Sequence, residues 1–244
     1  MSIKTDIKTN EAFLTLYKWL HQSSTEGLDW LDGKIEEIVK TANKRTLFTS
    51  YSAVPRYLGK QKLNLSEKDL QAAGLVAGWN PVDMTTDRAG RILLLLSFPS
   101  EDSDRYVATL EQIIAAADVE EAIAFYRSLP LLPYPERFKL RAAEGIRTNM
   151  TSVFNAVALN NPYPAQYLDD LAWNQMVLKA LFVGSPLHPI YGLKKRNNQQ
   201  LCQMLIDYAR ERLAAKRTVS PELWELVMPF KPEVVAELKS TSET

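Results

Sequence analysis

The most informative part of the sequence is the stretch RTNMTSVFNAVALNNPYPAQYLDDLAWNQMVLKALFV (residues 147–183), because it places polar side chains inside a strongly apolar helix. On a helix that turns about 100° per residue, the apolar side chains of residues 168–183 fall on every side. Asp170 and Asn174 share a sector with large apolar residues, so neither clearly faces water. A helix that is apolar all round belongs in an interior, and buried polar groups there need hydrogen-bond partners. We therefore expect a central helix that carries buried polar side chains.

The remaining sequence shows the same helical period almost everywhere. It contains only nine glycines, and no stretch alternates with the period of two that is typical of a half-buried strand. Ser103 and Asp118 are placed to begin helices, and Pro135 opens a helix that runs through Arg147. We predict an all-α fold of stacked antiparallel helix pairs, a HEAT-like or armadillo-like right-handed superhelix. An irregular globular helical domain is the alternative.

The balance of acidic and basic residues indicates which kinds of partner the protein can bind. The chain has 244 residues, and its 29 basic residues balance 29 acidic ones. A formal net charge of zero argues against a protein that binds nucleic acid through a bulk basic surface. We expect no nucleic-acid partner.

The cellular compartment is suggested by the single cysteine and the N-terminus. Cys202 stands among apolar residues, which predicts a buried thiol in a reducing compartment. No signal peptide is expected, and the apolar runs are far shorter than the roughly 20 residues that cross a bilayer. We expect a cytoplasmic protein without a transmembrane segment, and peripheral membrane contact stays open.

The polar residues of the opening stretch are the first candidates for a ligand site. Asn174 either clamps the backbone of the neighbouring NPYPA turn, which we favour, or faces a ligand. Asp170, one helical turn away, is its expected partner. Arg147 is the residue best placed to reach into a cleft. The ligand-binding candidates are Arg147, Asn149, Asn155, Asp170, Trp173, Asn174 and, more weakly, His188.

A second candidate site is the basic cluster Lys194, Lys195 and Arg196 at the start of the last long helix. Free backbone N–H groups at a helix N-terminus, together with basic side chains, can hold a phosphate or carboxylate. A solvent-exposed basic turn is the favoured alternative.

Catalytic and metal motifs are not recognisable. Asp169 and Asp170 loosely resemble the paired aspartates of prenyl-diphosphate enzymes, but adjacent residues on a helix point about 100° apart. Trp173 stands where a further acid would be needed. Cys202 lacks a context that would activate a thiol. We therefore assign no catalytic residue, metal or cofactor.

Four blocks of the C-terminal half are distinctive: YRSLPLLPYPE (126–136), EGIRTNMTSVFNAVALNNPYPAQYLDDLAWNQMVLKALF (144–182), MLIDYARERLAAKRTVSPELW (204–224) and MPF (228–230). In these blocks the chain resembles the EboA family. The resemblance implies a context: EboA-like proteins are encoded beside a UbiA-type prenyltransferase and a TatD-like metal hydrolase. That set is thought to support the handling or transport of small-molecule precursors in bacteria.

The resemblance and the helical pattern together favour three hypotheses. The first is a non-enzymatic scaffold or binding protein whose partners are pathway proteins or a small-molecule intermediate. The second is a small-molecule enzyme with Arg147, Asp170, Asn174 and His188 in one pocket, and the third is a nucleic-acid-binding helical repeat. We expect one helical domain over residues 1–244, with N-terminal helices in 1–85, an EboA-like core in 86–230 and a frayed tail in 239–244.

Overall fold

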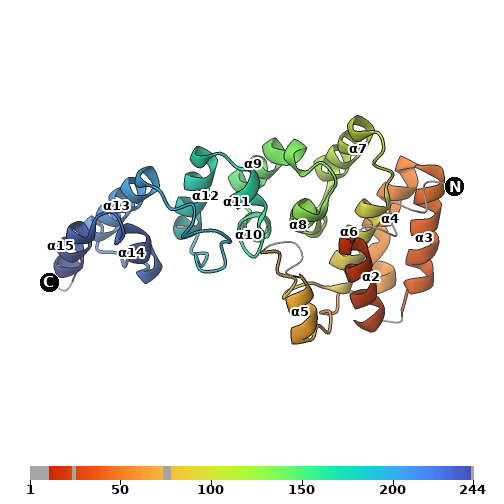
Figure 1. Cartoon of the computed structure of the whole chain (residues 1–244), viewed down its shortest axis with the longest axis horizontal. Helices are drawn as coiled ribbons and strands as arrows, with labels where there is room; N and C mark the ends of the chain where they lie inside the picture. The colour runs from red at the N-terminus through yellow and green to blue at the C-terminus, as the bar shows by residue number, and fades with distance from the viewer. Residues whose placement is uncertain (1–10, 24–25, 74–77, 243–244) are drawn as a thin grey trace. The chain divides into compact units, whose positions relative to one another are not determined.

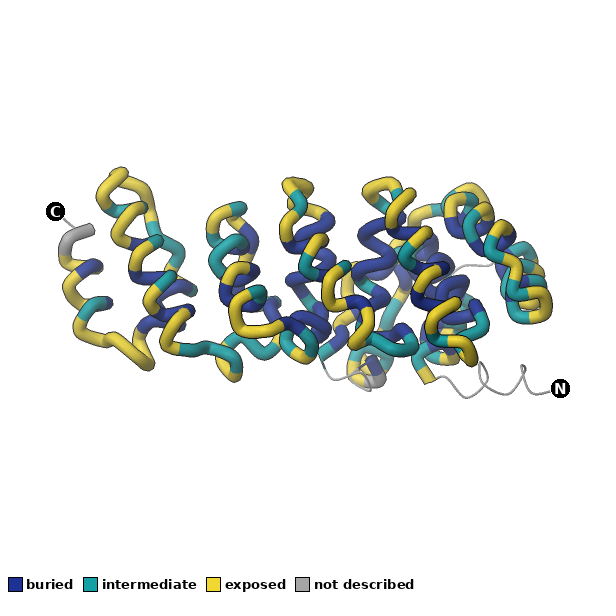
Figure 2. The backbone as a smooth tube through the Cα atoms, turned by 90° about the horizontal axis from the view of Figure 1, so that it is seen from above, coloured by how far each residue is buried: buried dark blue, intermediate teal, exposed yellow. Residues whose placement is uncertain are grey.

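Helix α6 (Thr86–Ser97) is the most deeply buried helix in the part of the chain that the structure describes. All of its residues except Arg88 are buried, and it packs against α2, α3, α4 and α8 (Figure 2). Its sequence TDRAGRILLLLS explains this position, because the run of aliphatic residues covers more than one side of a helix. Helix α6 is therefore the central helix among α2, α3, α4 and α8.

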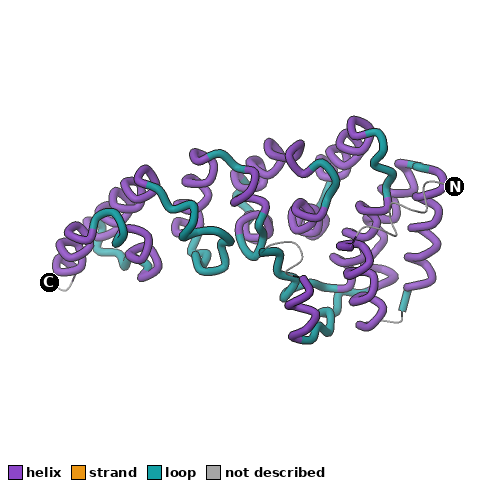
Figure 3. The backbone as a smooth tube through the Cα atoms, viewed as in Figure 1, coloured by secondary structure: helices purple, strands orange, loops and turns teal. Residues whose placement is uncertain are grey.

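The chain is all-α. The computed structural model describes residues 11–23, 26–73 and 78–242, and within them it contains no strand (Figure 3). Figure 1 labels the helices. Besides α6 they are α2 (Glu11–Ser23), α3 (Leu28–Thr41), α4 (Lys44–Leu58), α5 (Glu67–Ala73), α7 (Ser103–Ala116), α8 (Val119–Ser128), α9 (Lys139–Arg147), α10 (Thr151–Ala158), α11 (Tyr163–Tyr167), α12 (Asp170–Phe182), α13 (Gln199–Ala214), α14 (Pro221–Val227) and α15 (Pro232–Ser242), with short 3-10 helices at Leu129–Leu131 and Pro135–Phe138.

Several predicted helix boundaries are confirmed. Helix α7 begins at Ser103, and α9 ends at Arg147. Asp118 caps α8 by accepting a hydrogen bond from the N–H of Glu121, whose carboxylate in turn accepts one from the N–H of Asp118. This capping box satisfies backbone donors that a helix N-terminus leaves free. The last helix, α15, continues to Ser242, into the stretch expected to be a frayed tail, and residues 243–244 lie outside the described part.

The contacts divide the chain into two compact units, Met1–Tyr163 and Pro164–Thr244. In the first unit, α10 packs against α8 and α9, and α4 packs against α3 and α6. In the second unit, α13 packs against α12, α14 and α15. The prediction of one domain over residues 1–244 and that of a HEAT-like superhelix both stay predictions.

Close helix packing in the first unit depends on Gly90. A Cβ atom at this position of α6 would lie 2.4 Å from Leu58 Cδ1 and 3.0 Å from Val54 Cγ1 of α4. Both distances are shorter than carbon–carbon van der Waals contact. Gly90 therefore lets α4 and α6 approach each other.

None of the described helices is both long and apolar enough to cross a lipid bilayer.

Candidate functional site

The predicted site residues fall in both units. In the first unit, Arg147 ends α9 and is exposed, Asn149 is exposed in the following turn, and Asn155 lies half-buried on α10. The other candidates belong to the second unit. They are Asp170, Trp173 and Asn174 on α12, and His188, Lys194, Lys195 and Arg196 on the connection to α13.

Arg196 joins the two groups of candidates in the second unit. Its Nη1 donates to the carbonyl oxygens of Pro164 at 3.1 Å and Leu168 at 2.8 Å, and its Nη2 donates to Asp170 Oδ1 at 2.6 Å. Its guanidinium also lies over the ring of Trp173, 4.8 Å from the centroid, which is a cation–π contact. Arg196 therefore fastens the α12–α13 connection to α11 and the start of α12.

This arrangement corrects two expectations about α12. Asp170 is paired with Arg196 and its side chain is 75% exposed, so it is neither shielded from water nor the partner of Asn174. Leu171 and Phe182, at the two ends of α12, are also exposed. The helical-wheel prediction for α12 was wrong at Asp170. A helix with apolar residues on every side does not indicate which side its neighbouring helices will cover.

Asn174 is completely buried, and its partner is Asn198. Asn198 Nδ2 donates to Asn174 Oδ1 at 2.8 Å, and Asn174 Nδ2 donates to Asn198 Oδ1 at 3.2 Å. Asn198 Oδ1 also accepts the N–H of Leu201 at 2.9 Å and so caps α13. The prediction that Asn174 bonds to the backbone of the NPYPA turn is therefore wrong, because its partner is the side chain of Asn198. The amide pair connects α12 to the N-terminus of α13.

The NPYPA turn is held by one of its own residues, Asn161, which sequence reasoning missed. In the first unit, Asn161 Nδ2 donates to the carbonyl oxygens of Tyr126 and Ala156, each at 3.0 Å, and its Oδ1 accepts the N–H of Tyr163. Its place before Pro162 is typical of turn-forming asparagine, which was the available signal.

Trp173 is buried, and its indole N–H has no hydrogen-bond partner among the described residues. Burial of an indole contributes a large apolar area, whereas the unpaired N–H opposes burial. With Arg196 over its face, Trp173 is the apolar anchor of this side of α12.

His188 is exposed and lies beside Glu222 of α14. Glu222 accepts the backbone N–H groups of Leu187 at 3.0 Å and His188 at 2.7 Å, and the His188 ring Nδ1 lies 3.2 Å from the same carboxylate. Partial burial opposes ionisation of Glu222, but these donors together lower its pKa below the ordinary value. Glu222 thus holds the connection that carries His188.

The three residues of the basic cluster at 194–196 have different surroundings in the structure. Arg196 is engaged as described, whereas Lys194 is exposed and pairs with Glu225 at 3.6 Å, and Lys195 is exposed. An anion at this turn would therefore depend mainly on the two lysines, and the anion-binding prediction stays a prediction.

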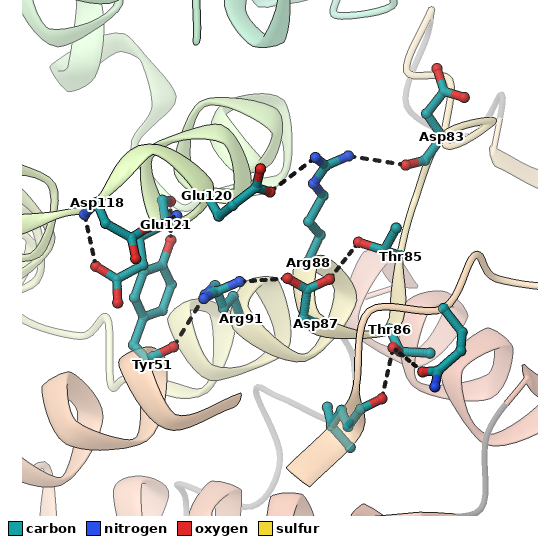
Figure 4. Close-up of polar contacts among 12 residues, drawn as sticks. Tyr51, Asp83, Thr85, Thr86, Asp87, Arg88, Arg91, Asp118, Glu120 and Glu121 are labelled. Carbon is teal, nitrogen blue, oxygen red and sulfur yellow. Dashed lines mark hydrogen bonds and ion pairs between the residues drawn. The ribbon is translucent and has the colours of Figure 1, made fainter. Parts of the chain in front are cut away.

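A second polar network lies in the core of the first unit, around Asp87 and Arg91 of α6 (Figure 4). Both side chains are 2% exposed, and Arg91 Nη1 donates to Asp87 Oδ2 at 2.8 Å. Arg91 Nε donates to the carbonyl oxygen of Tyr51, and the Thr85 hydroxyl donates to Asp87 Oδ1. Because both charges are paired and hydrogen-bonded, the network can lie in an apolar core.

The Tyr51 side chain links this network to α8. Its hydroxyl donates to the carbonyl oxygen of Glu121 at 2.7 Å, and burial raises its pKa. The Arg91 guanidinium lies 5.7 Å from the Tyr51 ring centroid. Sequence reasoning missed this network, although an acid and an arginine four residues apart before ILLLL were the signal for it.

The described residues do not assemble a recognisable catalytic or metal centre. Among them, no group of three or more His, Cys, Asp or Glu side chains is placed to hold a metal ion. Cys202 is buried as predicted, and burial raises the pKa of its thiol, which disfavours the nucleophilic thiolate. Asp170, Asn174 and His188 each have a different partner: Arg196, Asn198 and Glu222. The polar groups of the second unit therefore connect its helices.

Comparison with known families agrees with the sequence blocks quoted above. The family model described as "Metabolite traffic protein EboA" matches residues 12–228, which is most of the chain. The chain belongs to the EboA family. The EboA match includes α6 and its buried network as well as α12 and α13. No curated protein matches this EboA-family chain, and no solved structure does.

Proposed function

We propose that this EboA-family chain is a non-enzymatic scaffold or binding protein in metabolite traffic. Its partners would be other proteins of the same pathway, or the small-molecule intermediate that they handle. The family description supports a role with metabolites. The cytoplasm is the compartment that we propose, because a single buried thiol suits a reducing environment.

One observation carries the proposal. The polar side chains that an enzyme would need in the second unit are used to join helices: Arg196 binds Asp170 and the carbonyl oxygens of Pro164 and Leu168, and Asn174 binds Asn198. A catalytic acid, base or nucleophile has to reach the reacting atoms of a substrate. Groups that are already bonded to one another fit a rigid support for binding surfaces better than a reaction centre.

The experiment is co-purification from the native cell, with mass spectrometry of both the proteins and the small molecules that accompany the chain. We expect specific enrichment of pathway proteins or of one class of metabolite. The matched control is the same protein unfolded in denaturant before capture, which should lose the enrichment. If the purified protein turned over a pathway intermediate, and Asn174→Ala abolished turnover while the fold was retained, the proposal would be wrong.

A further inference from the structure

A histidine in the last turn of α2, His21, lies beside Asp32 of α3. Its ring Nε2 is 3.9 Å from Asp32 Oδ1, which is too long for a hydrogen bond. The Nε2 atom is buried and has no hydrogen-bond partner among the described residues. The two side chains as a whole are 33% and 40% exposed. The imidazole and the carboxylate therefore lie next to each other near the surface without being hydrogen-bonded.

Tyr17, one turn before His21 on α2, contacts both members of this pair. Its hydroxyl donates to Asp32 Oδ2 at 3.0 Å, and the centroids of the Tyr17 and His21 rings are 4.1 Å apart. Burial, and then the contact with Asp32, raises the pKa of Tyr17 to about 12, so the hydroxyl stays a donor at neutral and mildly acidic pH. Tyr17 thus holds Asp32 by one carboxylate oxygen while the other oxygen is the one nearer to His21.

The other charged groups of these helices and of their neighbours are engaged elsewhere or exposed. Asp69 of α5 accepts the indole N–H of Trp19 on α2. The charged residues of α6, which packs against both α2 and α3, each have an ion-pair partner: Asp87, Arg88 and Arg91. The remaining charged residues between positions 18 and 37 are exposed or paired with each other: Lys18, Glu26, Asp29, Lys34, Glu36 and Glu37. In the described part of the chain, Asp32 is therefore the charged neighbour of His21.

A proton added to the His21 ring would change this contact. A neutral imidazole has one N–H donor and one acceptor nitrogen, whereas an imidazolium has two donors and a positive charge. In the charged ring Nε2 carries a proton whichever tautomer preceded it, so Nε2 can donate to the carboxylate of Asp32. A positive charge in the last turn of a helix also interacts favourably with the helix dipole. Both effects stabilise the folded position of α2 once the imidazole is charged.

We propose that His21 and Asp32 form a pH-sensitive contact that fastens α2 to α3 more tightly in mildly acidic solution than at neutral pH. An ordinary histidine titrates near pH ~6.5, so its charge changes within the physiological range. Stability from a protonated histidine beside an acid is present below that value and is lost as the pH rises above it. The inference goes beyond the proposed function, because it holds whether the protein carries a metabolite or supports other proteins.

The test is hydrogen exchange of the α2 backbone amides in the full chain at about pH 7.5 and about pH 5.5, on either side of the ordinary histidine value. The rates are corrected for the pH dependence of exchange in unstructured peptides. We expect protection of these amides to rise about two- to fivefold at the lower pH, because a partly exposed ion pair contributes modestly.

Two variants should remove this rise. His21→Gln keeps a polar side chain that cannot be protonated. Asp32→Asn can still accept the hydrogen bond of the Tyr17 hydroxyl but carries no charge. If His21→Gln does not fold, the comparison of the wild type with Asp32→Asn decides.

His188→Gln is the matched control, because the second histidine of the chain belongs to the second unit and lies beside Glu222. It should leave the rise in α2 protection unchanged.

Two results would overturn the proposal. One is a wild-type protein in which α2 protection does not rise at the lower pH, and the other is an equal rise in folded His21→Gln or Asp32→Asn. An equal rise in Asp32→Asn alone would mean that the helix dipole acts without the acid of α3. Co-purification of a partner in the native cell could succeed in each case, so this failure is distinguishable from a failure of the proposed function.

Discussion

Asn174 and Asn198 exchange two hydrogen bonds between side-chain amides, and Asn198 also caps α13. Because Asn174 is completely buried, removing its partner leaves an amide without a hydrogen bond. We predict that Asn174→Ala and Asn198→Ala each lower the free energy of unfolding by about 1–3 kcal/mol. The measurement is urea unfolding of the two single variants and the double variant.

The double variant tests the pairing itself. If the two amides act on each other, its loss will be clearly smaller than the sum of the single losses. The exposed Asn149 gives the control, since Asn149→Ala should stay within about 0.5 kcal/mol of the wild type. Additive losses at positions 174 and 198 would show that the two amides are not coupled.

The buried pair of Asp87 and Arg91 should stabilise the first unit only while both charges are present. Removal of one partner leaves an uncompensated charge in the core, so Arg91→Met should destabilise the protein by about 3–5 kcal/mol. Asp87→Leu combined with Arg91→Met should restore much of that loss, because no charge then remains buried. Chemical denaturation followed by circular dichroism measures both. A double variant at least as unstable as Arg91→Met would contradict this description of α6.

The pH dependence of stability should carry a contribution from Glu222. Its pKa is lower in the folded state, because it accepts the N–H groups of Leu187 and His188. A lowered folded-state pKa gives stability that is present above the unfolded value of about 4.3 and is lost as the pH falls through the folded value. We predict that Glu222→Gln weakens the loss of thermal stability below that pH. An unchanged pH profile of the melting temperature in Glu222→Gln would refute the assignment.

At the scale of helices, two glycines should respond in opposite ways to alanine. A Cβ at Gly90 would meet Leu58 and Val54, so Gly90→Ala should cost about 1–3 kcal/mol through overpacking between α4 and α6. Gly33 is exposed within α3, and a Cβ there has no neighbour within 4 Å. Gly33→Ala should therefore stabilise the protein by about 0.5–1 kcal/mol. Thermal unfolding of both variants is the check, and a stabilised Gly90→Ala would contradict the close contact.

The start of a helix could be predicted from the sequence where capping residues within one turn determine it. Asp118 with Glu121 is a capping box, and the starts of α7 and α8 follow from residues within one turn. The partners across helices could not be predicted, because a helical wheel shows which residues share a side but not which neighbour covers it. Asp170 was assigned to Asn174 on the same helix, whereas both bind residues of the following connection.

The candidate site was predictable only in part. Of the residues chosen from the sequence, the structure brings together Asp170, Trp173 and Arg196, but Arg196 was chosen for an anion rather than for Asp170. The buried network of Asp87 and Arg91 was missed, because a charged residue before an apolar run reads as the exposed end of a helix. Its burial follows from the packing of four helices around α6. The aliphatic run in α6 indicates a buried helix, but it does not show which helices cover the turn that carries Asp87 and Arg91.

The chain is an EboA-family protein built from helices that fall into two compact units. The boundary between the units lies at the first residue of α11, inside the proline-rich turn that the sequence marks with Pro162 and Pro164. The polar residues on both sides of that boundary bond within their own unit. We therefore infer that the polar residues in the sequence of 147–183 serve to connect packed helices.

We propose that these polar residues support a binding protein and do not convert a substrate. The most direct measurement is untargeted mass spectrometry of a native-cell metabolite extract after incubation with the wild-type protein or with folded Asn174→Ala. We predict the same extract composition in both samples and in a protein-free control. A metabolite that disappears with the wild type, yields a product, and persists with folded Asn174→Ala would contradict the account.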